Sequence, residues 1–220
     1  AFPRGARGSV SSSVVVVALL AAGLSSSGVI DSKTRSKMFP GREVVGTETS
    51  RYAELTAVST GNSVTFFSGG SRVLTFPEPE RAEEGVHIPL LSHPSPGRVL
   101  LLGGTVGGVV EEVLAHPSVV SVDCVEIDDG LVSLFERVRK RVAEDDAGLN
   151  GDGTRRIFMD GRRYLSTTDR RYDVIIVDAP QPLNLQWNRY FTVESFGSAR
   201  RLLDEGGIFA LSHVSSEEYL

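Results

Sequence analysis

The stretch that decides the fold is "RVLLLGGTVGGVVEEVLAHPSVVSVDCVEIDDG", residues 98–130. It contains an apolar run, a turn with four glycines, a helical pattern, a second apolar run and a carboxylate. Apolar runs that alternate with helices are typical of strands buried on both faces of a parallel α/β sheet. Ligands of such sheets bind at the carboxyl ends of the strands. The residues that directly follow each strand are therefore the first candidates for a functional site.

The same alternation continues toward the end of the chain. It predicts a doubly wound α/β sheet with strands at 98–102, 119–127, 156–159, 172–177 and 207–212. Between the strands it predicts helices near 107–115, 130–143 and 192–203, the last with an N-cap in the region of Thr192.

A small antiparallel β unit precedes this sheet. Residues 51–76 read "RYAELTAVSTGNSVTFFSGGSRVLTF", in which Gly61-Asn62 and Gly69-Gly70 are turn signals between short strands. A helix bracketed by prolines follows in residues 77–97 and is expected to end before Pro94. We therefore expect three parts: a leader at 1–43, a small β unit at 44–80 and an α/β domain at 81–220.

The composition of the 220 residues, 40% hydrophobic and 23% charged, is that of a globular protein with one sizeable core. The net charge is -5, and the residues after position 50 carry 17 basic against 25 acidic side chains. An acidic body argues against binding of nucleic acid and is compatible with a cationic substrate. The single cysteine, Cys124, excludes an internal disulfide, and we interpret it as a buried strand thiol. We expect no metal site.

The N-terminal segment differs from the rest of the chain. Residues 1–30 contain no acid, carry Arg4 and Arg7, and include the apolar run from Val14 to Leu24. That run is shorter than the about 20 residues that a helix needs to cross a bilayer. A signal or transit segment, the end of a transmembrane helix and a disordered leader remain open. We favour a targeting or membrane-proximal segment, and therefore a membrane-associated or organelle-targeted protein over a freely cytoplasmic one.

The glycine turn departs from the dinucleotide fingerprint G-x-G-x-x-G, because Thr105 stands where the second glycine is required. A nicotinamide or flavin ligand is therefore not favoured. Gly103, Gly104 and Gly107 still let a ligand approach the backbone of a turn whose N–H groups open onto a helix. Taken alone, such a turn is equally typical of a plain strand-to-helix connection.

Carboxylates at successive strand ends strengthen the interpretation as a ligand site. Glu126 follows the second strand and can accept hydrogen bonds from both hydroxyls of a ribose. Asp160 follows the third strand and can accept from an exocyclic adenine amine, while Gly161 leaves room for the ring. Asp178 follows the fourth strand. Together with the glycine turn, these acids favour an adenosine-type ligand.

The joint motifs resemble the spermidine synthase (polyamine aminopropyltransferase) family. They are "HPSPGRVLLLGGTVGGVVEEVLAHPSVVSVDCVEID", "MDGRRYL" and "YDVIIVDAP", and "EEGVHIPLLSHP" upstream is similar too. The resemblance runs from about Thr47 to the end of the chain. Within the family, "APQPLNLQWNRYFTVESF" and "GGIFALSHVSSEEYL" look most like the branch whose synthase-like domain follows membrane-spanning segments.

The resemblance implies a methyltransferase-like, Rossmann-type sheet that binds decarboxylated S-adenosylmethionine. By motif position, Glu126 matches the ribose-binding acid, and Asp160 with Gly161 matches the adenine site. Asp178 matches the residue that takes a proton from the attacking amine, and Glu83 and Gln181 fall at substrate-binding positions. Such a sheet has seven strands, so we expect the final hairpin to be missing after the fifth.

Three positions depart from the family pattern. Val106 stands where the family commonly has an aspartate in the glycine turn, Gln181 replaces the second acid of a D-x-x-D-P loop, and Arg81 replaces the tyrosine of a Y-x-E stretch. These departures keep two alternatives to aminopropyl transfer open. One is an S-adenosylmethionine-dependent methyltransferase, and the other is a non-catalytic nucleoside-binding domain.

The ligands implied by the resemblance are small molecules. We expect no permanently bound cofactor, with decarboxylated S-adenosylmethionine or S-adenosylmethionine as cosubstrate and a polyamine as acceptor. A membrane tether through the N-terminus and a homodimer are left open. Trp187, Tyr190 and Phe191 could wall a substrate channel, but we interpret them first as core-forming residues.

Overall fold

The computed structural model describes residues 17, 38–142, 153–178 and 188–211. The chain divides into two compact units, Ala1–Val44 and Val45–Leu220. In the described part of the first unit, the N–H of Arg42 donates to the carbonyl of Phe39 at 3.1 Å and closes a turn. The predicted boundaries near residues 43 and 80 stay predictions.

An antiparallel sheet of four strands stands at the start of the second unit. Its strands follow one another in the order β1-β2-β3-β4, with bounds Val44–Thr49, Glu54–Thr60, Ser63–Ser68 and Ser71–Phe76. The turns between β2 and β3 and between β3 and β4 contain Gly61, Gly69 and Gly70, all with positive φ. A positive φ strains any residue with a side chain, so the two turns predicted from the glycines are confirmed.

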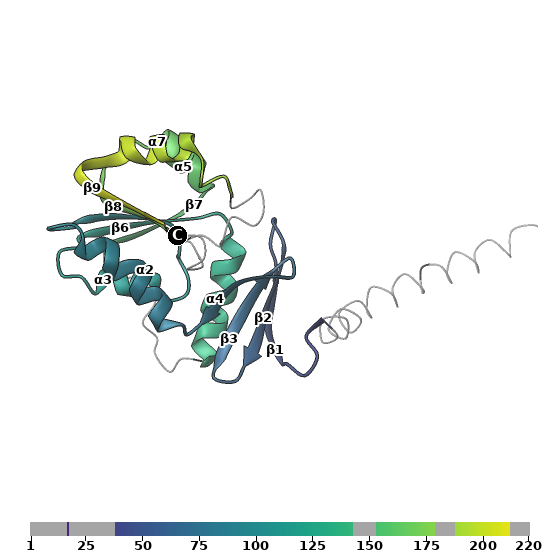
Figure 1. Ribbon diagram of the computed structural model, residues 1–220. Coiled ribbons are helices and arrows are strands. Elements are labelled where there is room, and N and C mark those ends of the chain that lie inside the picture. The colour runs from purple at the N-terminus through teal and green to yellow at the C-terminus, as the bar shows by residue number, and fades with distance from the viewer. Residues whose placement is uncertain (1–16, 18–37, 143–152, 179–187, 212–220) are drawn as a thin grey trace, which may run out of the picture. The chain divides into compact units, whose positions relative to one another are not determined.

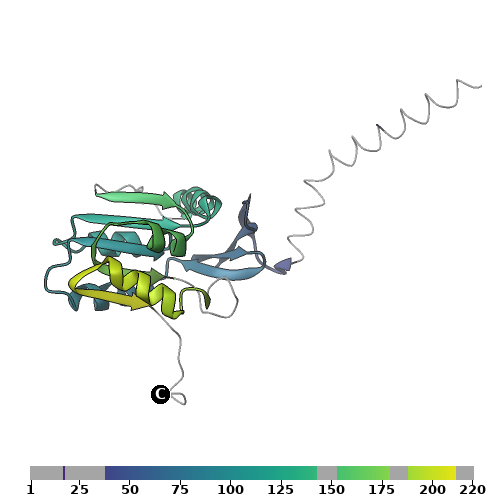
Figure 2. The ribbon, with the colours of Figure 1, turned by 90° about the horizontal axis from the view of Figure 1, so that it is seen from above.

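A parallel sheet of five strands forms the larger layer (Figure 1). Its order is β7-β6-β5-β8-β9, and the strands are Thr154–Phe158, Ser121–Glu126, Arg98–Gly103, Tyr172–Asp178 and Leu203–Leu211. Figure 2 shows β7 and β9 at opposite edges of this sheet, with the antiparallel sheet beyond the carboxyl ends of the strands. The predicted doubly wound α/β class is confirmed.

The strand boundaries match the expectations with one exception. The last strand begins at Leu203, whereas the sequence pattern predicted a start at residue 207. Gly206 and Gly207 interrupt the apolar pattern before that point, so the pairing with β8 that extends the strand was not visible in the sequence. The expected absence of a final hairpin stays a prediction, because residues 212–220 lie outside the described residues.

Helices cover both faces of the parallel sheet (Figure 1). One face carries α2 (Pro79–Leu91) and α3 (Val109–Leu114), and the other carries α5 (Gly161–Thr167) and α7 (Val193–Leu202). Helix α4 (Asp129–Val142) packs against the antiparallel sheet. The predicted N-cap of α7 is confirmed, since Thr192 Oγ1 accepts a hydrogen bond from the N–H of Ser195 at 3.3 Å.

Helix α5 was not predicted from the sequence. It begins directly after Asp160, whose side chain caps it by accepting from the N–H of Arg163 at 2.9 Å. The first helical residue is a glycine, which is a poor helix former. An aspartate before an apolar pair, here Tyr164 and Leu165, was the available signal.

The central strand β5 explains why the decisive stretch is apolar throughout. Val99 and Leu101 pack on the face with α2 and α3, whereas Leu100 and Leu102 pack on the face with α5 and α7. All four side chains are buried. Cys124 on β6 is also buried, as predicted, and burial raises the pKa of its thiol to about 12.

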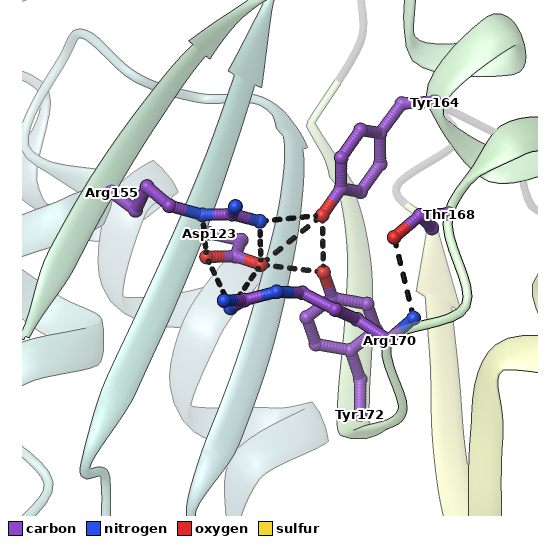
Figure 3. Close-up of polar contacts among 6 residues, drawn as sticks. All are labelled: Asp123, Arg155, Tyr164, Thr168, Arg170 and Tyr172. Carbon is purple, nitrogen blue, oxygen red and sulfur yellow. Dashed lines mark hydrogen bonds and ion pairs between the residues drawn. The ribbon is translucent and has the colours of Figure 1, made fainter.

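A buried acid ties three strands and a helix together (Figure 3). Asp123 on β6 is 3% exposed and accepts two hydrogen bonds from Arg155 on β7, at 2.9 and 2.7 Å. Its Oδ2 also accepts from the hydroxyls of Tyr172 on β8 at 2.6 Å and of Tyr164 on α5 at 3.1 Å. Arg170 adds a second guanidinium at 3.3 Å.

The pKa of Asp123 shows that its charge is stabilised in the fold. Burial raises the pKa, but the hydrogen bonds from Arg155 and Tyr172 outweigh burial and hold the pKa below its ordinary value. A carboxyl group with a lowered folded pKa stabilises the fold at neutral pH, and this contribution is lost as the pH falls through the folded pKa. The cluster therefore contributes as an ion pair at neutral pH.

Replacement of Asp123 by alanine should lower the free energy of unfolding by about 3 kcal/mol, because two buried hydroxyls and two guanidinium groups lose their acceptor. Equilibrium denaturation with urea at pH 7 measures the difference. Asp169→Ala is the matched control, because Asp169 is exposed and its ion pair with Arg201 is long, at 3.8 Å. Equal loss in both variants would contradict the assignment of the cluster as a stabilising element.

Candidate active site

The carboxyl ends of β5 and β8 meet where the order of the strands reverses. Gly103 at the end of β5 lies opposite Asp178 at the end of β8 in the parallel register. Gly104 follows with φ +65°, and a Cβ on it would lie 2.9 Å from Cβ and 3.0 Å from Oδ2 of Asp178. The missing side chain of Gly104 therefore lets the Asp178 carboxylate sit against the turn. This is the position at which doubly wound sheets bind ligands.

Glu126 occupies the end of β6, next to β5. Its Oε1 accepts hydrogen bonds from the N–H groups of Ile127 at 2.8 Å and Asp128 at 3.3 Å. The pKa of Glu126 is raised to about 7, mainly by burial and to a smaller extent by the negative charges of Asp128 and Asp178, while the two backbone hydrogen bonds act in the opposite direction. A ligand hydroxyl that donates a hydrogen bond to Glu126 would favour the charged carboxylate form of Glu126.

Asp178 forms an ion pair with Arg81, which comes from the first turn of α2. The contact joins the Nη2 atom of Arg81 to Oδ1 of Asp178. Burial raises the pKa of Asp178, while the charge of Arg81 and its hydrogen bond act in the opposite direction. The carboxylate is thus an acceptor with increased proton affinity that already has a cationic partner.

These residues line one cleft, which offers about 50 Å³ to the centres of water-sized molecules. Three of its lining residues are ionisable acids or bases of the site, namely Arg81, Glu126 and Asp178. The remainder are mostly apolar or glycine, and they are Val73, Leu74, Leu102, Gly103, Gly104, Val106, Val125, Ile127, Leu131 and Tyr190. A mostly apolar pocket with a few convergent polar groups is typical of a small-molecule site.

Asp160 and Gly161 lie beside this cleft but do not line it. Asp160 caps α5 through Oδ1, and its Oδ2 forms an ion pair with Arg189. A Cβ on Gly161 would come within 3.1 Å of the Cε1 and Cζ atoms of Tyr190. The space expected to admit an adenine ring therefore holds a tyrosine ring in this structure. The assignment of Asp160 and Gly161 to the adenine site stays a prediction.

Two of the remaining predicted residues, Glu83 and Gly107, are described and are not among the residues that line the cleft. Glu83 lies on the exposed side of α2, two residues from Arg81. Gly107 has φ +88°, and a Cβ on it would lie 3.9 Å from Cδ1 of Leu74. Gln181 lies outside the described residues.

Sequence reasoning missed two features of the cleft. Arg81 was recognised only as a departure from a motif, because nothing in the sequence connects it to a residue 97 positions away. Tyr190 was interpreted first as core-forming, and it both packs against the face of α5 and α7 and lines the cleft. Its position two residues before Thr192, the N-cap of α7, was the available signal.

Among residues 38–142, 153–178 and 188–211, no group of three or more His, Cys, Asp or Glu side chains is placed to share a metal ion. The charged groups that line the cleft are the carboxylates of Glu126 and Asp178 and the guanidinium of Arg81.

The fold and the site define a class. A parallel sheet in this order, with a glycine turn after its central strand and acids at the neighbouring strand ends, is an α/β domain of the methyltransferase-like type. The chain belongs to the family described as the spermine/spermidine synthase domain, whose model matches residues 80–218.

Individual relatives agree with this family. The chain is 29% identical over 206 residues to a polyamine aminopropyltransferase of Leptospira interrogans, covering 92% of this chain and 41% of the relative. It is 37% identical over 122 residues to that of Methanocaldococcus jannaschii, covering 56% of this chain and 40% of the relative. The chain thus spans less than half the length of these curated relatives.

Solved structures show the same fold. A crystal structure of spermidine synthase in complex with the transition state analogue AdoDATO matches with a TM-score of 0.66 and 29% identity. The match covers 76% of this chain and 57% of that one. Spermidine synthase from Thermotoga maritima matches with a TM-score of 0.64 and 28% identity, over 76% of this chain and 56% of that one.

The raised pKa of Glu126 predicts a pH-dependent stability. Between its ordinary value of 4.5 and about 7, the folded protein holds a proton that the unfolded chain has lost. Stability should therefore fall by about 3 kcal/mol as the pH rises through this window, and Glu126→Gln should remove that loss. Urea denaturation at pH 5 and pH 8 measures it. Glu205→Gln, at an exposed position, is the control and should retain the loss.

Proposed function

We propose that this protein transfers an aminopropyl group from decarboxylated S-adenosylmethionine to an amine. The family and the names of the relatives support the reaction, and those names give polyamines as the acceptors of the relatives themselves. The observation that carries the proposal is the placement of Asp178. This carboxylate lies at the reversal of strand order, in the same cleft as Glu126.

The reaction needs an acceptor nitrogen with a free lone pair. An amine of this kind is protonated at neutral pH, so it must lose a proton to a base before it attacks. Asp178 is that base, because burial raises its proton affinity. The nitrogen forms a bond to the carbon attached to the sulfonium, and the carbon–sulfur bond breaks. Its electron pair goes to sulfur and leaves neutral methylthioadenosine, while the proton passes from Asp178 to solvent.

Glu126 binds the donor in this scheme. Its carboxylate accepts hydrogen bonds from the ribose hydroxyls, while the apolar wall of the cleft holds the uncharged parts of the ligand. The donor is a cosubstrate that is consumed in each turnover. Binding through charged Glu126 also implies that nucleoside affinity rises with pH through about 7.

Asp178→Asn should reduce amine-dependent release of methylthioadenosine by about 10²-fold or more, because an amide cannot take a proton. Affinity for methylthioadenosine itself should change little, since Glu126 is intact. Asp173→Asn is the matched control on the same strand, where the side chain accepts from the N–H groups of Gly97 and Arg98 far from the cleft. Equal rates for wild type and Asp178→Asn would assign Asp178 a structural role.

The N-terminal segment supports a further part of the proposal, association with a membrane. Arg4 and Arg7 precede the apolar run from Val14 to Leu24. No helix among the described residues is long and apolar enough to cross a bilayer. The run itself lies outside those residues, apart from Val17.

Flotation with vesicles of phosphatidylcholine and phosphatidylglycerol tests the membrane association. We expect the protein to float with the vesicles and a variant without residues 1–43 to remain in the soluble fraction, because the apolar run is then missing. If the full chain and the shortened variant float equally, the membrane attachment does not depend on residues 1–43. Sedimentation of the same preparations reports whether the chain forms the homodimer that we also propose.

A further inference from the structure

The cleft contains a cation that belongs to the protein itself. Arg81 reaches from α2 over the end of β8 and contacts Oδ1 of Asp178. The Arg81 side chain is 41% exposed, whereas that of Asp178 is 15% exposed. The guanidinium can therefore exchange its partner by moving toward solvent, while the carboxylate is held in place by β8 and by the turn at Gly104.

The charges of the cleft are close to balanced. Arg81 cancels the charge of Asp178, and Glu126 with its pKa of about 7 carries only part of a negative charge at neutral pH. Val106 lines the wall between them and is 5% exposed, so the glycine turn offers no carboxylate at that position. A dication that enters this cleft finds the acid Asp178 already paired and the like charge of Arg81 beside it.

An ion pair of this kind is complementary to a ligand that carries both charges. The ligand's ammonium can take the place of Arg81 on Asp178, and a carboxylate of the same ligand can then pair with the released guanidinium. Each charge keeps an opposite partner, whereas a diammonium ligand leaves Arg81 facing a like charge. Like charges brought together in an apolar site are strongly unfavourable and serve to exclude the wrong ligand.

We propose that the Arg81–Asp178 pair makes the cleft specific for an amine that carries a carboxylate, in preference to a diamine or polyamine. The inference rests on the proposed function for the reaction and names the class of acceptor. Nitrogen attack, loss of the carbon–sulfur bond and proton transfer to Asp178 are as given above. Arg81 is a specificity-determining residue that binds the end of the acceptor remote from the attacking nitrogen.

A matched pair of ligands tests this. 4-Aminobutanoate and 1,4-diaminobutane have similar lengths and differ by a carboxylate in place of one protonated aminomethyl group. Calorimetric titration of each into protein saturated with methylthioadenosine measures their affinities separately from nucleoside binding. We expect the wild type to bind 4-aminobutanoate about 10-fold or more tightly than the diamine. A wild-type preference for the diamine would overturn the proposal.

Variants at Arg81 test whether this residue causes the preference for 4-aminobutanoate. Arg81→Met removes the charge and keeps an apolar stem, so the preference should fall by about 10-fold or more, whereas Arg81→Lys should retain it. Arg98→Met is the control, because Arg98 forms a similar exposed pair with Asp204, at 2.5 Å, at the other end of β5. An unchanged ratio in Arg81→Met, with an unchanged thermal midpoint, would overturn the proposal.

The carboxylate could also come from the donor, because S-adenosylmethionine carries one and its decarboxylated form does not. Titration of both donors into wild type and Arg81→Met distinguishes the sources. If Arg81→Met changes only the ratio between donors, the acceptor assignment is overturned and the pair recognises the donor. Failure of methylthioadenosine to bind any variant would instead refute the proposed function, independently of Arg81.

Discussion

The close approach of the end of β8 to the turn after β5 is the constraint on which the cleft depends. A Cβ at Gly104 would collide with Asp178, so a side chain there would displace either the turn or the carboxylate. The parallel register sets Gly103 opposite Asp178, and the reversal of strand order opens the sheet at the same point. Backbone geometry thus places the Asp178 carboxylate at the carboxyl edge of the sheet, independently of any ligand.

The sheet edge that carries Glu126 and Asp178 is supported by a polar cluster farther back along the strands. Asp123 binds groups from β7, α5 and β8 at once, and it is nearly inaccessible to water. A buried acid with several donors holds the relative positions of β6 and β8 on either side of β5, and Glu126 and Asp178 end those two strands. The two carboxylates of the cleft are therefore positioned by a polar cluster that lies outside it.

The cleft uses burial to change the chemistry of its acids. Removal from water raises the proton affinity of both Glu126 and Asp178, which suits one to a pH-sensitive hydrogen bond and the other to taking a proton. Arg81 opposes this effect at Asp178 and nearly neutralises the pocket. The reaction proposed for this pocket rests on the family, whereas the pairing of Arg81 with Asp178 is observed in the structure itself.

The sequence by itself determined the strands, the turns and the order of the main elements, because apolar periodicity and glycine positions are local properties of the chain. It also indicated Glu126 and Asp178, since acids that follow parallel strands share one edge. It did not reveal α5, whose first residue is a glycine, or the early start of β9, which depends on pairing with β8.

Only the tertiary structure decided which residues share the cleft. Arg81 contacts Asp178, Tyr190 lies against Gly161, and Glu83 is exposed on α2, although all five positions were named from the sequence. Contacts between residues so far apart along the chain depend on how α2 and the segment before α7 pack on the sheet. Packing is a property of the whole fold, and no local pattern of residues encodes it.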